Sequence, residues 1–131
     1  MSIKVEGKIT HEWVDGINLI NMITGQYYSI TYNTNPKVTN WIRKVPFDHD
    51  YICIWKDQRK NHWCIGNCGF DDDYLSQCGV GENPNACECW IYNPSITNCP
   101  QDTIISNWML AGYEEKLGGD LQIQPPIGKS K

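Results

Sequence analysis

Hydrophobic and polar residues alternate along the first part of the chain. Between Ile3 and Trp13 the odd-numbered positions are mostly apolar and the even-numbered positions are polar. This is the period of a β-strand with one buried face. A short apolar run from Asn18 to Ile23 and an alternating run from Gln26 to Tyr32 follow, each after a turn-forming pair. The pattern predicts a three-stranded antiparallel meander over the first third of the chain.

Two later segments have the spacing of a helix. Apolar residues from Val38 to Val45 recur at i, i+3, i+4 and i+7, and Pro46 would end that helix. The segment from Ile104 to Ala111 also suits a helix, with a strand from Thr103 to Leu110 as the alternative. We therefore expect one or two short helices.

The middle of the chain has the pattern of a β-hairpin. Tyr51 to Trp55 and His62 to Ile65 are apolar runs separated by a wholly polar segment. If Lys56 pairs with Asn61, Cys53 falls opposite Cys64, at a separation that allows a disulfide. A slip of one residue in the register would remove that pairing.

Length and composition favour one mainly β domain. The 131 residues suit a single domain, with a compact body over 1–117 and an extended tail over 118–131. Aromatic residues make up 11% of the chain, and they and the β-branched residues fit pleated sheets. We expect an antiparallel β-sandwich or an open barrel with one or two short helices, cross-linked by disulfides.

Charge and hydropathy argue against two classes of partner. The net charge is −4, and the eleven Lys and Arg residues are scattered, so nucleic acid is not an expected partner. No apolar run approaches the roughly 18 residues that span a bilayer, so no membrane span is expected. The first residues alternate in polarity and lack the continuous apolar core of a signal peptide.

Cysteines concentrate in the middle of the chain and predict a secreted protein. Disulfides persist in oxidising compartments, so this density indicates an extracellular location. An odd number allows about three disulfides of open connectivity, and the remaining thiol is either buried or joins two chains in a dimer. The seven are Cys53, Cys64, Cys68, Cys78, Cys87, Cys89 and Cys99.

A metal site is the alternative interpretation of these residues. Zinc accepts tetrahedral nitrogen and sulfur ligands, and the sequence offers His62, Cys64, Cys68, Cys87 and Cys89. The chain lacks the C-x-x-C spacing that structural zinc sites often use. A zinc-binding protein of this kind would be an intracellular interaction module. Calcium could bind the run Asp71, Asp72 and Asp73, although the run lacks the spacing of an EF-hand loop.

One short segment resembles acid-base machinery. His49 lies between Asp48 and Asp50, and a histidine beside a carboxylate can act as a general base. A small secreted hydrolase is therefore an alternative function. A solvated loop histidine is the favoured interpretation, because Pro46 precedes the segment and a strand follows it.

Exposed aromatic residues carry the main functional hypothesis. In the alternating strand from Cys87 to Tyr92, Cys89 would face inward while Trp90 and Tyr92 would face outward. The hairpin would add Trp55 or Trp63 to this surface, next to the acidic loop from Asp71 to Asp73. Such surfaces stack on sugar rings or anchor protein interfaces, unless the core buries all of them. We expect a small secreted cysteine-rich binding protein, effector-like or lectin-like, that recognises a glycan or a protein.

Overall fold

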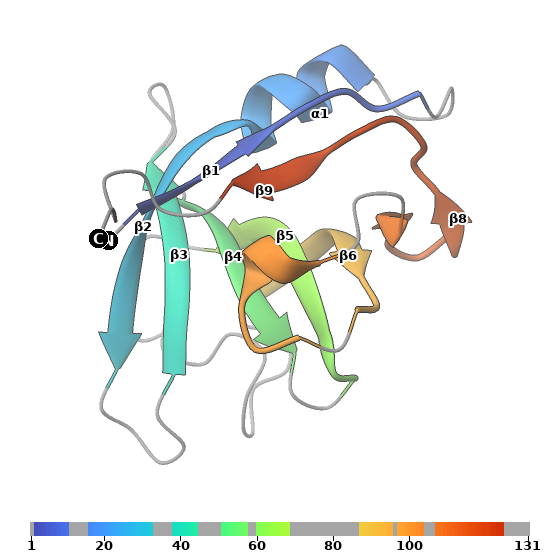
Figure 1. Ribbon diagram of the computed structural model, residues 1–131. Helices are drawn as coiled ribbons and strands as arrows, with labels where there is room; N and C mark the ends of the chain where they lie inside the picture. Colours follow the sequence, from blue (N-terminus) through green and yellow to red (C-terminus); the bar gives the residue numbers. More distant parts are fainter. Residues whose placement is uncertain are drawn as a thin grey trace.

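One curled antiparallel sheet makes up most of the structure, a computed structural model that describes residues 2–10, 16–32, 38–44, 51–57, 60–68, 87–95, 97–103 and 107–124 (Figure 1). Its elements, in chain order, are β1 Ser2–Glu6, α1 Gly16–Ile23, β2 Gly25–Tyr32, β3 Val38–Lys44, β4 Tyr51–Asp57, β5 His62–Cys68, β6 Cys87–Asn93, the 3-10 helix η1 Pro100–Asp102, β7 Met109–Leu110, β8 Glu115–Lys116 and β9 Gln122–Gln124. The mainly β class and the half-barrel form of the sheet agree with the predicted open barrel.

The sheet curls because one segment near the C-terminus contacts both of its edges. The strand order is β8-β7-β6-β5-β4-β3-β2-β1-β9, so β8 and β9 lie at opposite edges although they are neighbours along the chain. Between them, the Leu117 amide donates a hydrogen bond to the Trp108 carbonyl, at 3.0 Å. The Leu117 carbonyl accepts one from the amide of Thr10, at 3.2 Å. This segment therefore draws the two edges toward each other.

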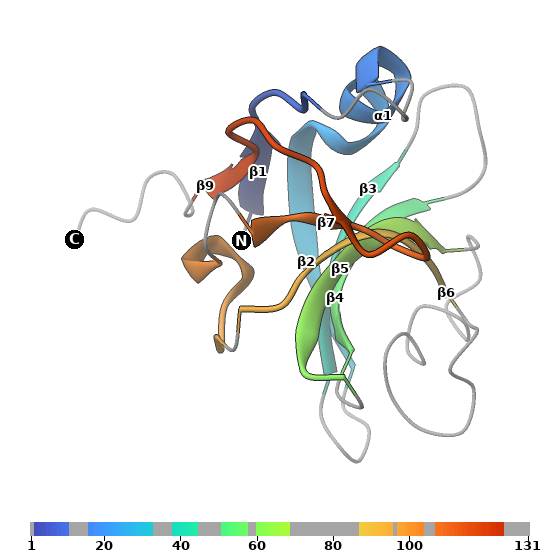
Figure 2. The ribbon, with the colours of Figure 1, turned by 90° about the vertical axis from the view of Figure 1, so that its right-hand side faces the viewer.

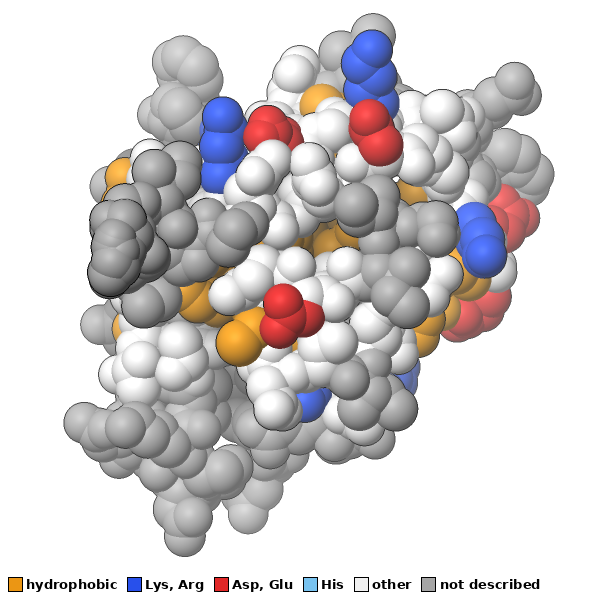
Figure 3. All heavy atoms as spheres, in the orientation of Figure 1, with side chains coloured by type: hydrophobic (Ala, Val, Ile, Leu, Met, Phe, Trp, Pro, Cys, Tyr) orange, Lys and Arg blue, Asp and Glu red, His pale blue; other side chains and the backbone are white. Residues whose placement is uncertain are grey.

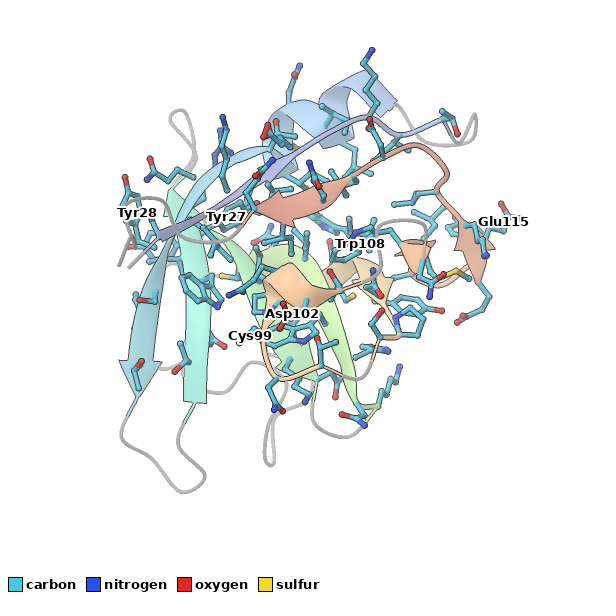
Figure 4. The ribbon with its side chains drawn as sticks, in the orientation of Figure 1. Tyr27, Tyr28, Cys99, Asp102, Trp108 and Glu115 are labelled. Carbon is cyan, nitrogen blue, oxygen red and sulfur yellow. The ribbon has the colours of Figure 1, made fainter. Side chains whose placement is uncertain are left out.

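The main core fills the inside of the curl. Figure 4 shows Trp108 pointing into this space, and Figure 2 shows α1 at one end of the sheet, beside β1 and β2. The 3-10 helix η1 lies against β9. The buried residues of this cluster are Ile3, Val5, Ile23, Tyr27, Trp41, Ile52, Ile54, Trp63, Ile65, Ile91, Trp108, Leu117, Leu121 and Ile123.

Helix α1 occupies the segment that was predicted to be the second strand, so the predicted meander is wrong. Leu19, Ile20 and Ile23 all contact the main core, which is the pattern of one helix face. The buried hydroxyl of Tyr27 donates to the Ile23 carbonyl at 2.6 Å, and the Thr24 hydroxyl donates to the Ile20 carbonyl at 2.6 Å. The Ile20 carbonyl also accepts the Thr24 amide, at 2.9 Å, and the Tyr27 hydroxyl gives the last carbonyl of the helix a side-chain partner.

Strand β3 occupies the segment that was predicted to be the first helix, and that prediction is also wrong. Trp41 faces the main core and is 7% exposed, while the next residue, Ile42, packs on the outer face of the sheet. A strand with apolar contacts on both faces carries adjacent apolar residues, and this pattern imitates helical spacing.

The C-terminal part differs from the prediction in a similar way. Where the helix from Ile104 to Ala111 was expected, Met109 and Leu110 form strand β7, as in the alternative prediction of a strand, and residues 104–106 lie outside the described ranges. Strand β9 belongs to the sheet, so this part of the expected tail is integrated into the body.

The surface carries mixed charge. On the face in Figure 3, Lys and Arg side chains are interspersed with Asp and Glu, so basic groups do not gather there in one patch. Among the described residues, no helix has the length and apolar character needed to cross a membrane.

Candidate functional site

The hairpin of β4 and β5 has a different register from the predicted one. Trp55 pairs with Cys64, Asp57 pairs with His62, and Cys53 lies opposite a glycine. The predicted pairing of Cys53 with Cys64 is therefore wrong. At the end of β4 the Asn61 amide donates a hydrogen bond to the Asp57 carbonyl at 2.7 Å, and Asn61 has a φ of 58°.

A β-bulge in β6 changes which side chains share a face. The pairing passes from Ile65 with Ile91 to Gly66 with Cys89, so Trp90 is the additional residue. Because of the bulge, Cys89 and Tyr92 lie on the same outer face, contrary to the predicted alternation. Bulges often redirect side chains in this way next to functional sites.

Gly66 allows β5 and β6 to approach closely at the bulge. A Cβ atom at this position would lie 1.9 Å from the carbonyl oxygen of Glu88. Any larger residue would therefore push the β6 backbone away. The position of Cys89 depends on this glycine.

The outer face of the sheet holds a second, smaller apolar cluster beside a polar cavity. Cys53, Trp55 and Cys64 are buried in this cluster, and Cys89 and Tyr92 pack against it. The adjacent cavity has a volume of about 370 Å³. Its lining residues are Asp57, Lys60, His62, Cys64, Cys89, Tyr92, Ala111, Gly112 and Glu114.

Three groups that can donate electron pairs lie close together in this polar cavity, and Cys89 lines the same cavity. A carboxylate oxygen of Asp57, a ring nitrogen of His62 and the sulfur of Cys64 all lie within 4.8 Å of one another. Cys89 packs against the outer cluster that contains Cys64, and its thiol donates a hydrogen bond to the Ile91 carbonyl at 3.3 Å. The sequence identified His62, Cys64 and Cys89 as ligand candidates but missed Asp57. A correct hairpin register would have placed Asp57 opposite His62 and so shown Asp57 to be a fourth candidate.

The protonation of these groups follows from their surroundings. The neighbouring Cys89 thiol and burial raise the pKa of the Cys64 thiol, so Cys64 is protonated at neutral pH. Burial lowers the pKa of His62, an effect that the Asp57 carboxylate opposes. The imidazole is therefore neutral at pH 7, which is the form that binds metals. Burial also raises the pKa of Cys53, to about 12.

The imidazole is held in place by an aromatic ring. The rings of His62 and Tyr92 are stacked with their centroids 4.5 Å apart and an angle of 26° between their planes. The Tyr92 hydroxyl donates a short hydrogen bond to the Glu114 carboxylate. Burial and then this bond raise the pKa of Tyr92 to about 12.

A second cavity, of about 610 Å³ and mostly apolar, lies between α1 and the strands β6 and β7. Inside it, the indole nitrogen of Trp90 donates to the Glu88 carboxylate at 2.8 Å. Tyr113 is 61% exposed at its margin. The residues that line this apolar cavity are Leu19, Met22, Glu88, Cys89, Trp90, Leu110, Ala111 and Tyr113.

The predicted aromatic surface is divided between core and cavities. Trp63 is 4% exposed, and its indole nitrogen donates to the Thr97 carbonyl at 3.1 Å, so its expected place on the surface is corrected to the core. Trp90 lines the apolar cavity and Tyr92 lines the polar one. Trp63 is buried because the hairpin register turns it toward the inside of the curl, with Ile65.

Several predicted residues lie outside the described ranges. These residues are His49 with Asp48 and Asp50, the run Asp71, Asp72 and Asp73, and Cys78. The hydrolase, calcium and acidic-loop hypotheses therefore stay predictions.

The cysteines are not arranged as the sequence led us to expect. Cys53, Cys64, Cys89 and Cys99 are free thiols, so the expected set of disulfides is not shown. The backbones of Cys68 and Cys87 face each other across β5 and β6. Cys68 lies four residues from Cys64, about 13 Å along an extended strand, too far for both to bind one zinc ion.

The fold and these sites define an antiparallel β half-barrel with a ligand-sized apolar cavity at one edge and a cluster of sulfur, nitrogen and oxygen donors on its outer face. Comparisons with protein-family models, curated proteins and solved structures found no match. The functional argument therefore rests on the residues of this chain.

Proposed function

We propose that the protein is a binding protein whose apolar cavity takes a sugar ring of a glycan. The observation that carries this proposal is the meeting of Trp90, Tyr113 and the Glu88 carboxylate in one cavity of about 610 Å³. Cavities of roughly 300 to 1,000 Å³ are typical of small-ligand sites. A protein partner suits this site less well, because stable protein interfaces bury about 800 Å² on each side.

The chemistry of the cavity fits a sugar. A sugar ring has an apolar C–H face, which packs on aromatic rings, and hydroxyl groups, which donate hydrogen bonds. The Glu88 carboxylate is held by the Trp90 indole, and its remaining lone pairs can accept bonds from hydroxyl groups. One exposed acid beside two aromatic rings therefore offers both kinds of contact.

The first prediction is that loss of an aromatic ring weakens glycan binding. The parent protein would be screened on an array of immobilised oligosaccharides, and the best oligosaccharide would then be titrated by calorimetry. Tyr113→Ala and Trp90→Ala should each weaken binding by about 5-fold, because a ring stacked on the ligand contributes about 1 kcal/mol. Tyr113 is exposed, so its replacement should leave the melting temperature unchanged.

Tyr28→Ala is the matched control. Tyr28 is 56% exposed on β2, lines neither cavity, and lies on the opposite side of the molecule from β8 in Figure 4. Its replacement should not change glycan binding. If no oligosaccharide binds, the proposal fails. If instead the neutral apolar dye Nile red binds and Tyr113→Ala releases it, the cavity is a binding site but the ligand class is wrong.

Secretion remains part of the proposal, and one disulfide would support it. Cys68 and Cys87 are partners in the antiparallel register, where Cα atoms are about 4.5 to 5.5 Å apart and a disulfide fits. We predict that this pair is oxidised in protein isolated without reductant. Peptide mapping should then find Cys68 linked to Cys87, and a free thiol at either residue would contradict the prediction.

A further inference from the structure

We propose that Asp57, His62, Cys64 and Cys89 bind one zinc ion in the polar cavity on the outer face of the sheet. Three of these ligands come from the β4–β5 hairpin, and Cys89 comes from β6. The hairpin register and the β6 bulge together place all four on the walls of one cavity. This inference is independent of the glycan proposal, because no aromatic contact with a ligand enters it.

The distances suit a tetrahedral ion. Zinc bonds of about 2.0 to 2.3 Å place neighbouring ligand atoms of a tetrahedron about 3.3 to 3.8 Å apart. The donor atoms of Asp57, His62 and Cys64 are within 4.8 Å of one another. Side-chain rotations that move each donor atom by about 1 Å would bring them to these positions. Cys89 lines the same cavity as these three residues and packs against the cluster that contains Cys64, so its sulfur is available as the fourth donor.

The donor set favours zinc over calcium or magnesium. Thiolate sulfur and imidazole nitrogen are ligands that zinc prefers, whereas calcium and magnesium prefer oxygen. Zinc would displace the protons of Cys64 and Cys89, and both protons would leave to solvent as the two Zn–S bonds form. With the Asp57 carboxylate, the site would carry one net negative charge. Lys60 lines the same cavity and can balance it.

Groups around the ligands would hold them in position. The stacked ring of Tyr92 fixes the plane of the His62 imidazole, and the bond from its hydroxyl to Glu114 fixes the Tyr92 ring. Such outer groups set the orientation of metal-binding histidines in other proteins. Burial of Cys64 keeps water from one side of the site.

Cobalt substitution tests the proposal in the full chain. The protein would be reduced, freed of metal and titrated with Co²⁺, which reports thiolate ligands by charge-transfer absorption in the near ultraviolet and tetrahedral geometry by strong bands in the visible. We expect one Co²⁺ per chain with both signals, displaced by Zn²⁺, and a higher melting temperature with zinc. Cys89→Ser and His62→Gln should each weaken binding by at least about 100-fold.

Cys99→Ser is the matched control. Cys99 is also a free thiol, lies beside η1 in Figure 4 and lines neither cavity, so its replacement should leave the cobalt spectrum and affinity unchanged. Melting temperatures of the metal-free variants would show that each one folds. Three results would overturn the proposal: a weak octahedral spectrum, unchanged affinity in both site variants, or a Cys64–Cys89 disulfide in the protein as isolated.

Discussion

Trp108→Ala is expected to lower the free energy of unfolding by about 3 to 5 kcal/mol, the range found when large aromatic residues are removed from cores. Trp108 is 2% exposed and fills the inside of the curled sheet. Its carbonyl also accepts the hydrogen bond from Leu117, in the segment that draws the two sheet edges together. A cavity here would loosen the packing of both edges. Urea unfolding followed by tryptophan fluorescence, with circular dichroism as a second probe, would measure the loss.

Two phenylalanine variants separate lost volume from lost hydrogen bonding. Trp108→Phe and Trp63→Phe remove the same atoms from buried positions. The Trp63 indole donates to Thr97, whereas the Trp108 indole has no partner among the described residues. Trp63→Phe should therefore cost about 1 kcal/mol more. Equal losses would mean that the Trp63 hydrogen bond contributes nothing net, and a Trp108→Ala loss below about 1 kcal/mol would place Trp108 outside the core.

The first strand and the β4–β5 hairpin could be predicted from the sequence. Ile3 and Val5 alternate with polar residues, and the β4–β5 hairpin has two apolar runs around a polar turn. The first strand has the period of one buried face, whereas the hairpin has both faces covered and was recognised from its two short apolar runs and polar turn. Two other segments with apolar residues at adjacent positions were assigned to the wrong type of element. Ile42 follows Trp41 in a strand with two covered faces, while Leu19 and Ile20 lie on one face of a helix.

The metal-ligand candidates could be predicted only in part. Their residue types were visible in the sequence, but which of them meet depends on the hairpin register and on one additional residue in β6. A shift of two positions in that register brings Asp57 opposite His62 and separates Cys53 from Cys64. The bulge at Trp90 then brings Cys89 to the same face as Cys64. Neither feature changes the hydrophobic pattern enough to be read from one sequence.

Gly66→Ala is expected to lower the free energy of unfolding by about 3 kcal/mol, the upper part of the range for overpacked sites. The new Cβ would lie 1.9 Å from the Glu88 carbonyl oxygen, and backbone atoms cannot move away as the end of a flexible side chain can. Strand β6 would have to shift, and Cys89 would move with it. If Cys89 binds zinc, the variant should also lose most of its affinity for Co²⁺, measured as for the parent.

Gly112→Ala provides the contrast, because it strains the backbone without a clash. Gly112 has a φ of 86°, and a Cβ there would meet nothing within 4 Å. Its replacement should cost about 1 kcal/mol, since an L-residue disfavours this conformation. A larger loss in Gly66→Ala would therefore measure the close approach of β5 and β6. If the two variants were equally stable, that approach would not be what holds Cys89 beside Cys64, and the bulge would have to be maintained by the packing of Trp90 against the main core.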